Sequence, residues 1–569
     1  MSRRLRPLLF WVMAVWGLAL VGLPMVGMRA ASKSLLGGAR GAVLGPPGQL
    51  LEGVGIQLIA DRTAIRTTVY TSEDGRYEFP VLESGAYTLR VPRPMEFKPY
   101  VKKSVRIAGA TQLEDIRLER VSDTEFLPPT DAILAQLTGT EWMMNLPGTG
   151  EEKRVFTTSC LFGCHSLQQV FRNKYDERSW RLIYQRMIRS GSSPLIKDTP
   201  PTATTRSRSG RLMLEEEQFI PKWLASVRGP ESKLAPLHYL PRETGRSTRV
   251  IVTEYELPRE LTATHDVHGD SMGNIWYTQH RSAHAGKLDP RTGLVTEYRI
   301  PEKKKDTPGA LPGQHRVFVD KNDIVWFWEA WDHHLTGLDA RTGQIKYRQS
   351  KATPTSLNGA GGIGGPNFAM DDAGFVYQVY RDPATATGPG GEVLKTDPRT
   401  GEIVKRFKLK TLSGTYDNTV TPDGRYWAGG LGYLDMKTGE SWEPEVAPDL
   451  LVPARGAFDL LNNAWFGGRG GMLIKHDAKT HRLQLFRPPV GPYETFYEAM
   501  PDKNGEIWAG GLHSGRFWRF NPTNQMWTGY MMPEPYAHDR RTWIDNSTTP
   551  VTVWFVDQQG YMVRIQPLD

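Results

Sequence analysis

The sequence is poor in cysteine and nearly balanced in charge, and both features narrow the possible functions. Only two of the 569 residues are cysteine, which excludes a disulfide-rich scaffold and any metal or iron–sulfur site built from four thiolates. The formal net charge is +8, but four of these charges are arginines among the first 29 residues. Because no basic stripe or base-stacking motif is present elsewhere, we expect no nucleic-acid partner.

Long hydrophobic runs are also absent, except at the N-terminus. Residues 7–28 carry no charge and follow three arginines, a pattern typical of export from the cytoplasm. The run is longer than an ordinary signal-peptide core and approaches the roughly 20 residues that span a bilayer. Residues 1–31 are therefore interpreted either as a cleaved signal peptide or as an N-terminal membrane anchor. Either one predicts a periplasmic or otherwise extracytoplasmic protein, with a possible membrane tether through residues 7–28.

Residues 32–121 contain short alternating strands separated by glycine and proline, which predicts a small antiparallel β-sandwich. The motifs Gly41-Ala-Val, Gly53-Val-Gly-Ile and Thr71-Ser-Glu-Asp-Gly-Arg-Tyr-Glu-Phe belong to this segment. Through them it resembles the carboxypeptidase regulatory-like (transthyretin-like) domain. The resemblance implies a structural or adhesive role, and the segment contains no catalytic constellation.

Residues 122–233 change to helical spacing, most clearly over 180–188 and 212–227. Both cysteines lie here, and a histidine follows the second one, in Cys160-Leu-Phe-Gly-Cys164-His165. Two thiols with an adjacent imidazole are what covalent haem attachment requires, although the usual spacing has two residues between the cysteines. The alternative is a local disulfide in an oxidising compartment.

This segment resembles small c-type cytochrome domains, which are all-α. The resemblance implies covalently bound haem c held by Cys160 and Cys164, with His165 as one ligand of the haem iron. A thioether suits the sixth position in electron transfer, and we take Met187 as the candidate, with Met213, Met143 and Met144 as alternatives.

Residues 249–569 repeat a strand that ends in an aromatic residue, then a turn, then further strands, at a period of 40 to 50 residues. The turn is the block Asp-x-Arg/Lys-Thr-Gly, as in Asp289-Pro-Arg-Thr-Gly293. Seven copies predict a seven-bladed β-propeller. Residues 250–258 match the strand that the last copy lacks, so we expect them to complete the seventh blade and close the ring. The predicted fold class is therefore mainly β and multidomain.

The recurring motifs Gly273-Asn-Ile-Trp-Tyr-Thr, Gly286-Lys-Leu-Asp-Pro-Arg-Thr-Gly and Val295-Thr-Glu-Tyr resemble those of the virginiamycin B lyase (streptogramin lyase) propellers. That family uses histidines before the inner strands, a glutamate at a strand end and bound Mg²⁺. The resemblance implies that His265 and His315 are acid/base residues and that Glu329 is a metal ligand, in a β-elimination. Two matching positions differ, because Gln279 replaces a glutamate and Gly313 carries no carboxylate.

Seven of the thirteen histidines fall within the first two predicted blades, which points to a site there. The leading hypothesis is an exported monohaem c-type cytochrome, an electron-transfer protein or oxidoreductase with a redox partner protein or a small-molecule substrate. The second is a lyase-like enzyme acting on an ester or polysaccharide. The third is an extracytoplasmic binding protein without catalysis.

Overall fold

The structure is a computed structural model that describes residues 36–122, 124–160, 166–190, 212–259, 263–301, 313–329, 334–349, 368–380, 391–409, 418–428, 432–443, 453–468, 470–536, 539–557 and 559–569. These residues belong to one compact unit, Leu36–Asp569. The predicted leader, residues 1–31, lies outside them. Among the described residues, no helix has the length and apolar character needed to cross a membrane.

The first domain is the predicted β-sandwich. Two sheets enclose a core that includes Ile56, Leu58, Phe79 and Ile116. One sheet contains β1 (Gly37–Gly45), β2 (Gln49–Leu50), β5 (Arg76–Pro80) and β8 (Ile116–Arg117). The other contains β3 (Gly55–Ala60), β4 (Arg66–Tyr70), β6 (Gly85–Arg90) and β7 (Val101–Ile107).

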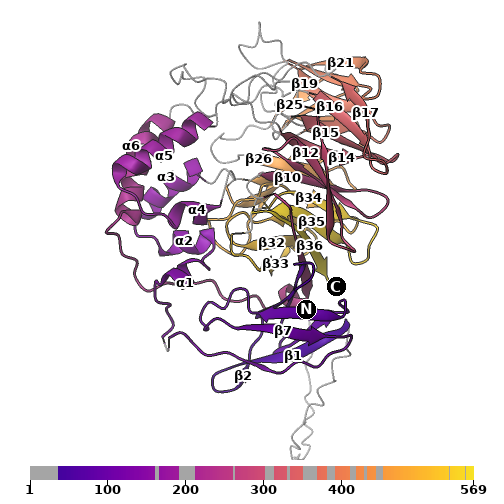
Figure 1. The fold of residues 1–569 in the computed structure, drawn as a ribbon. Helices are drawn as coiled ribbons and strands as arrows, with labels where there is room; N and C mark the ends of the chain where they lie inside the picture. Colours follow the sequence, from indigo (N-terminus) through magenta and orange to yellow (C-terminus); the bar gives the residue numbers. More distant parts are fainter. Residues whose placement is uncertain are drawn as a thin grey trace, which may run out of the picture. The chain divides into compact units, whose positions relative to one another are not determined.

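Six α-helices follow in the part of this segment that the structure describes, in agreement with the helical spacing. They pack around a core that contains Trp142, Phe156, Trp180 and Trp223, and the helices α2 to α6 appear together in Figure 1. Their bounds are α1 (Asp131–Leu134), α2 (Gly139–Asn145), α3 (Gly150–Cys160), α4 (Leu167–Phe171), α5 (Glu177–Ser190) and α6 (Leu212–Arg228). The helices alone do not define a cytochrome, so that assignment stays a prediction.

The rest of the described chain confirms the β-propeller, with seven four-stranded antiparallel arrangements (Figure 1). Blades 1 to 3 contain β10 (Thr264–Gly269), β11 (Ile275–Gln279), β12 (His284–Asp289) and β13 (Leu294–Arg299); β14 (Gln314–Val319), β15 (Ile324–Glu329), β16 (His334–Asp339) and β17 (Ile345–Gln349); and β18 (Ala369–Met370), β19 (Val376–Tyr380), β20 (Gly391–Thr396) and β21 (Ile403–Leu409).

Blades 4 to 6 contain β22 (Asn418–Val420), β23 (Arg425–Ala428), β24 (Tyr433–Asp435) and β25 (Ser441–Trp442); β26 (Pro453–Phe458), β27 (Ala464–Gly468), β28 (Met472–His476) and β29 (Leu483–Phe486); and β30 (Met500–Pro501), β31 (Ile507–Gly510), β32 (Arg516–Asn521) and β33 (Met526–Met531). Blade 7 combines β34 (Asp539–Asp545), β35 (Thr552–Asp557) and β36 (Tyr561–Pro567) with β9 (Val250–Glu256), which precedes blade 1 in the chain.

The ring is closed by β9, as the orphan strand 250–258 predicts. It pairs antiparallel with β36 over its whole length, from Val250 opposite Pro567 to Glu256 opposite Tyr561. Its other edge pairs with β4 of the sandwich, so the seventh blade and one sandwich sheet form a single eight-stranded sheet. This pairing leaves neither edge of β9 open.

The repeated aromatic residues have a structural role inside each blade. In four blades a tryptophan indole N–H donates to an aspartate six residues earlier, at 2.9–3.0 Å, in the pairs Trp276–Asp270, Trp326–Asp320, Trp465–Asp459 and Trp508–Asp502. The same aspartates accept backbone N–H groups of the turn that joins the first two strands. The aromatic repeat thus fixes the turn geometry of the blades.

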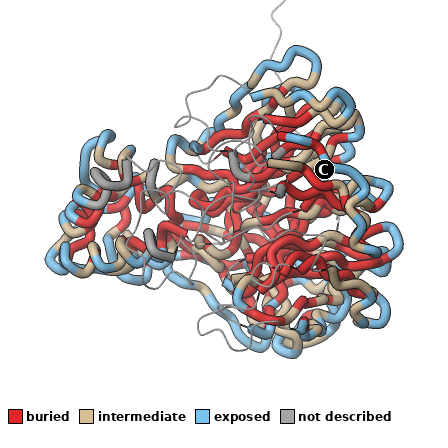
Figure 2. The backbone as a smooth tube through the Cα atoms, turned by 90° about the horizontal axis from the view of Figure 1, so that it is seen from above, coloured by how far each residue is buried: buried red, intermediate tan, exposed pale blue. Residues whose placement is uncertain are grey.

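Apolar residues of neighbouring blades pack against each other around the complete ring. Seven clusters join successive blades, and each contains side chains from both partners. Figure 2 shows buried residues along the strands and exposed residues mainly on the connecting turns. Trp326 and Trp328 fill the cluster between blades 2 and 3.

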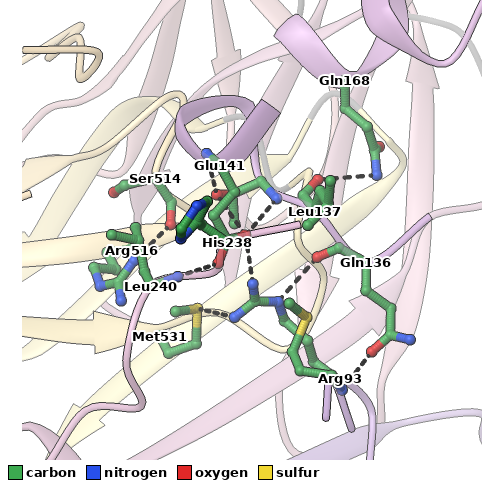
Figure 3. Close-up of polar contacts among 12 residues, drawn as sticks. Arg93, Gln136, Leu137, Glu141, Gln168, His238, Leu240, Ser514, Arg516 and Met531 are labelled. Carbon is green, nitrogen blue, oxygen red and sulfur yellow. Dashed lines mark hydrogen bonds and ion pairs between the residues drawn. The ribbon is translucent and has the colours of Figure 1, made fainter. Parts of the chain in front are cut away.

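A buried ion pair connects the helices to the sandwich and to blade 6. The Glu141 carboxylate accepts from Arg93 at 2.5 Å and from the backbone N–H groups of Thr138 and Leu240 at 2.9 Å (Figure 3). Arg93 also contacts the Met531 sulfur at 3.8 Å. Burial raises the pKa of Glu141, but Arg93 and the two N–H groups outweigh it, so the pKa lies below its ordinary value.

We expect Glu141→Gln to destabilise the protein by about 3 kcal/mol, because Arg93 loses its charge partner in a buried site. Since the folded pKa of Glu141 is depressed, its contribution is present at neutral pH and is lost as the pH falls. Urea denaturation followed by circular dichroism at two pH values measures both effects. The exposed Glu151, which pairs with Arg154 on the surface, supplies the control Glu151→Gln. Equal stability of the two variants would contradict the prediction.

Candidate active site

The first strands of the blades line the centre of the ring. Strand β10 contacts β14 and β34, and β26 contacts β22 and β30. Four of the first strands contain an irregularity in their pairing at matching positions, in blades 1, 2, 5 and 7. A β-bulge re-aims the side chains of the extra residues. The residues inside the four irregular stretches are His265 and Asp266, His315 and Arg316, Ala454 and Arg455, and Arg540 and Arg541.

Three imidazoles meet where these first strands come together at the centre of the ring, the region that we call the channel. His265 and His315 are 0% and 2% exposed, and His280, which directly follows β11, is half-buried. The ring centroids of His265 lie 4.1 Å from those of both His280 and His315. One nitrogen of each ring lies within 4.8 Å of the others. The structure therefore brings together both predicted catalytic histidines and adds His280, which sequence reasoning did not single out.

A carboxylate and a guanidinium hold two of these rings. Asp266 lies 2.5 Å from Nδ1 of His265. Arg455, from blade 5, donates to both oxygens of Asp266, at 2.9 and 3.1 Å, and also lies 3.1 Å from Nδ1 of His315. Tyr497 places its hydroxyl 3.3 Å from Nε2 of His265. These contacts join blades 1, 2, 5 and 6 across the channel.

The channel has more positive than negative groups among its described side chains. Arg316, Arg455, Arg540 and Arg541 all influence the titration of the cluster, whereas the carboxylates are Asp266 and Glu498. Glu498 lies 3.4 Å from Arg541. Burial raises the pKa of Asp266, but Arg455 and Arg541 outweigh it and keep the carboxylate ionised.

The three histidines are neutral at physiological pH. Burial is the largest cause, and it lowers the pKa of His265 and His315 well below the ordinary 6.5. His280 and Arg455 lower the pKa of His265 further. Burial and Arg540 lower the pKa of His280 to about 3. Neutral imidazoles can accept a proton or ligate a metal, which the protonated rings cannot do.

Glu329 does not join this cluster. Its carboxylate accepts from Arg348 at 3.0 and 2.7 Å and from the hydroxyl of Thr336. The amide of Gln279, where the lyase resemblance would have a carboxylate, donates to Glu297 at 3.0 Å. Glu329, the predicted metal ligand, is therefore held in an ion pair within its own blade. Glu329 lies on β15, and Arg348 lies on β17 of the same sheet.

The predicted haem ligands are described only in part. Cys160 ends α3, is half-buried and packs against the helical core. Cys164 and His165 lie outside the described residues, as does the side chain of Met187. The backbone of Met187 is part of α5.

A positional signal in the sequence could have revealed the channel residues that were missed. The residues four and five positions before the turn aspartate are Asp266 and His265 before Asp270, and Arg316 and His315 before Asp320. The same offsets give Glu498 and Tyr497 before Asp502, Arg541 and Arg540 before Asp545, and Arg455 before Asp459. When the repeats are aligned on this aspartate, the polar channel residues of five blades therefore occupy equivalent sequence positions.

Comparison with known proteins supports the first domain directly. A family model of the carboxypeptidase regulatory-like domain matches residues 38–119, so the chain contains such a domain. No curated protein matches the sequence significantly.

Several solved structures are similar to the propeller. A virginiamycin B lyase from Staphylococcus aureus is 16% identical, with a TM-score of 0.44, over 56% of this chain and 99% of that chain. A streptogramin B lyase is 16% identical, with a TM-score of 0.45, over 57% and 100%. The extracellular domain of a one-component system from B. thetaiotaomicron is 14% identical, with a TM-score of 0.39, over 53% and 40%. These identities are 16% or lower, so we assign the seven-bladed propeller from the strand pairing within this chain.

Proposed function

We propose that the propeller channel is the active site of an exported lyase that eliminates an oxygen substituent β to a carboxylate or ester. The observation that carries this proposal is the neutral, buried His265, held by Asp266 among arginines. Polar contacts join side chains of blades 1, 2, 5, 6 and 7 around this histidine.

His265 has the properties of a general base. The ionised Asp266 can only accept a hydrogen bond, so its contact with Nδ1 places the imidazole proton there. The lone pair is then on Nε2, the atom that faces Tyr497. Because its pKa is lowered well below 6.5, this nitrogen is unprotonated at neutral pH and is available to accept a proton.

The arginines supply the electrostatic part of the reaction. Four guanidinium groups against two carboxylates favour an anionic substrate and stabilise the negative charge that develops on the carboxyl or ester oxygen. Arg455 also contacts His315, whose Nδ1 and Nε2 lie 3.1 and 3.4 Å from one guanidinium nitrogen. The neutral His315 ring carries one N–H, which can donate a hydrogen bond to the same developing oxyanion.

The elimination is balanced without a further reactant. The C–H bond α to the carboxyl group breaks, and the proton moves to Nε2 of His265. The electron pair forms the new C=C bond, and the bond from the β-carbon to oxygen breaks. The leaving oxygen then takes the proton from His265, which returns to its neutral state.

Magnesium does not fit the described donors. Mg²⁺ prefers oxygen ligands, whereas the three closest donors are imidazole nitrogens, which suit zinc or copper better. The nearby carboxylates of Asp266 and Glu498 are paired with arginines, and Glu329 is paired with Arg348. We therefore assign the stabilisation of the negative charge that develops on the substrate oxygen to the arginines.

Export from the cytoplasm is part of this proposal. It is supported by the basic and apolar pattern of residues 1–28 and agrees with the carboxypeptidase regulatory-like domain.

We expect His265→Gln to lower kcat about 10²- to 10⁴-fold, because the variant has no general base. The substrates are a polyuronate, whose sugars carry a carboxylate, and a cyclic depsipeptide of the streptogramin B class. The measurement is the ultraviolet absorbance of the unsaturated product. Since protonation inactivates the base and its pKa is depressed, kcat/KM of the wild type should stay constant down to pH 6.5 and fall only below it.

His481→Gln is the matched control, since this histidine stacks on Tyr433 in the outer part of blades 4 and 5 and touches no channel residue that we assign. Unchanged activity of His265→Gln, or no product from either substrate class with the wild type, would overturn the proposed elimination.

We propose a second function, electron transfer by haem c, for the helical segment. Its support is the place of Cys160 at the end of a helix and against the apolar core, directly before the rest of the attachment motif. The buried indole N–H groups of Trp142 and Trp223 also have no acceptor among the described residues. When bound, haem would supply one-electron chemistry.

Production together with haem-attachment machinery should give a reduced-minus-oxidised spectrum with the α-band of a c-type haem. We expect Cys160→Ala to weaken covalent attachment and His165→Ala to change the spectrum, because each removes one of the groups that hold haem. Circular dichroism of the variants checks that the helices fold. A wild-type protein without haem, and with a Cys160–Cys164 disulfide in its place, would contradict this function.

A further inference from the structure

A cavity lies beside the helices, away from the channel. It has a volume of about 1000 Å³, and its lining comes from α1, α4, the C-terminal end of α6 and two residues of blade 7, Tyr536 and Gln559. None of the channel residues lines it.

The charge of this cavity is strongly one-sided. Among the described residues that line it, four are cations and one is an acid: Arg172, Lys174, Arg228, Lys233 and Asp131. Lys174 donates to the backbone carbonyl of Ser232 at 3.1 Å, and no salt bridge is formed between Asp131 and these cations. A hollow with this excess of positive charge attracts anions.

Arg228 is the residue that points to a ligand. It is 3% exposed, its guanidinium stacks over Trp142 at 4.9 Å, and it forms no ion pair within the described chain. Its Nε has no hydrogen-bond acceptor there. Burying a guanidinium without a carboxylate costs folding free energy, and a bound anion would offset that cost.

We propose that this cavity is a binding site for a small multivalent oxyanion, a carboxylate or phosphate compound, with Arg228 as its anchor. A planar guanidinium binds the two oxygens of such a group side by side. Arg172 and Lys174, at the exposed part of the lining, add charge to the remaining oxygens. Gln169 supplies a neutral hydrogen-bond donor, whereas the amide of Gln168 donates to the backbone carbonyls of Ala135 and Leu137.

The oxyanion has two possible sources. One is a soluble small molecule. The other is the pair of carboxylates of a haem attached to the preceding motif, because Ser166 lines the cavity and directly follows His165. The second source rests on the proposed haem function, whereas the first does not.

The test is isothermal titration of the full chain with citrate and with inorganic phosphate. We expect Arg228→Gln to weaken binding about tenfold or more and Arg172→Gln to weaken it severalfold. Lys222→Gln is the matched control, because Lys222 is an exposed cation of the same helix outside the cavity, and it should bind as the wild type does. Arg228→Lys keeps the positive charge but loses the paired N–H donors of the guanidinium, so it should also bind more weakly than the wild type. This variant keeps the test decisive if Arg228→Gln fails to fold.

Each titration is repeated with protein produced without haem-attachment machinery, which holds no covalent haem. Binding to both proteins identifies a soluble ligand as the source, and binding to the haem-free protein alone identifies the haem carboxylates. Failure of both probes to bind either protein would overturn the proposal. So would equal affinity of the wild type and both Arg228 variants.

Discussion

The ion pair between Asp266 and Arg455 is the contact on which the proposed active site depends. It crosses the propeller channel from blade 1 to blade 5, and neither side chain is exposed to solvent. Arg455 keeps Asp266 ionised, Asp266 orients His265, and Arg455 also reaches His315. A buried charge without its partner costs folding free energy, so Asp266 and Arg455 each depend on the other. Together they orient the imidazoles of His265 and His315.

The propeller brings these groups together because each blade delivers its first strand to the same axis. The rigidity of that arrangement comes from elsewhere in the blade, from the apolar clusters between blades and from the aspartate–tryptophan pairs at the turns. β9 closes the ring and at the same time continues into the sandwich sheet. The first domain is thereby joined through one sheet to the seventh blade, which also carries Arg541 of the channel.

The sequence predicts much of this fold and only part of the site. Repeats have a period that is visible in one dimension, so the blades and the closing strand could be predicted. His265 and His315 were found because they are histidines in the first two blades. Arg455 was missed because it lies about 190 residues from Asp266 in the chain, and only the ring brings them into contact. Glu329 was assigned to the site from its strand position, which does not reveal its ion pair with Arg348.

The most direct measurement of the central claim is the protonation state of His265, by nitrogen NMR of histidine-labelled protein. The His265→Gln variant assigns the signal. The structure predicts a neutral ring at pH 7 with its proton on Nδ1, and a ring that remains neutral as the pH falls to 6. A charged imidazolium at pH 7, or a proton on Nε2, would contradict the assignment of His265 as the general base.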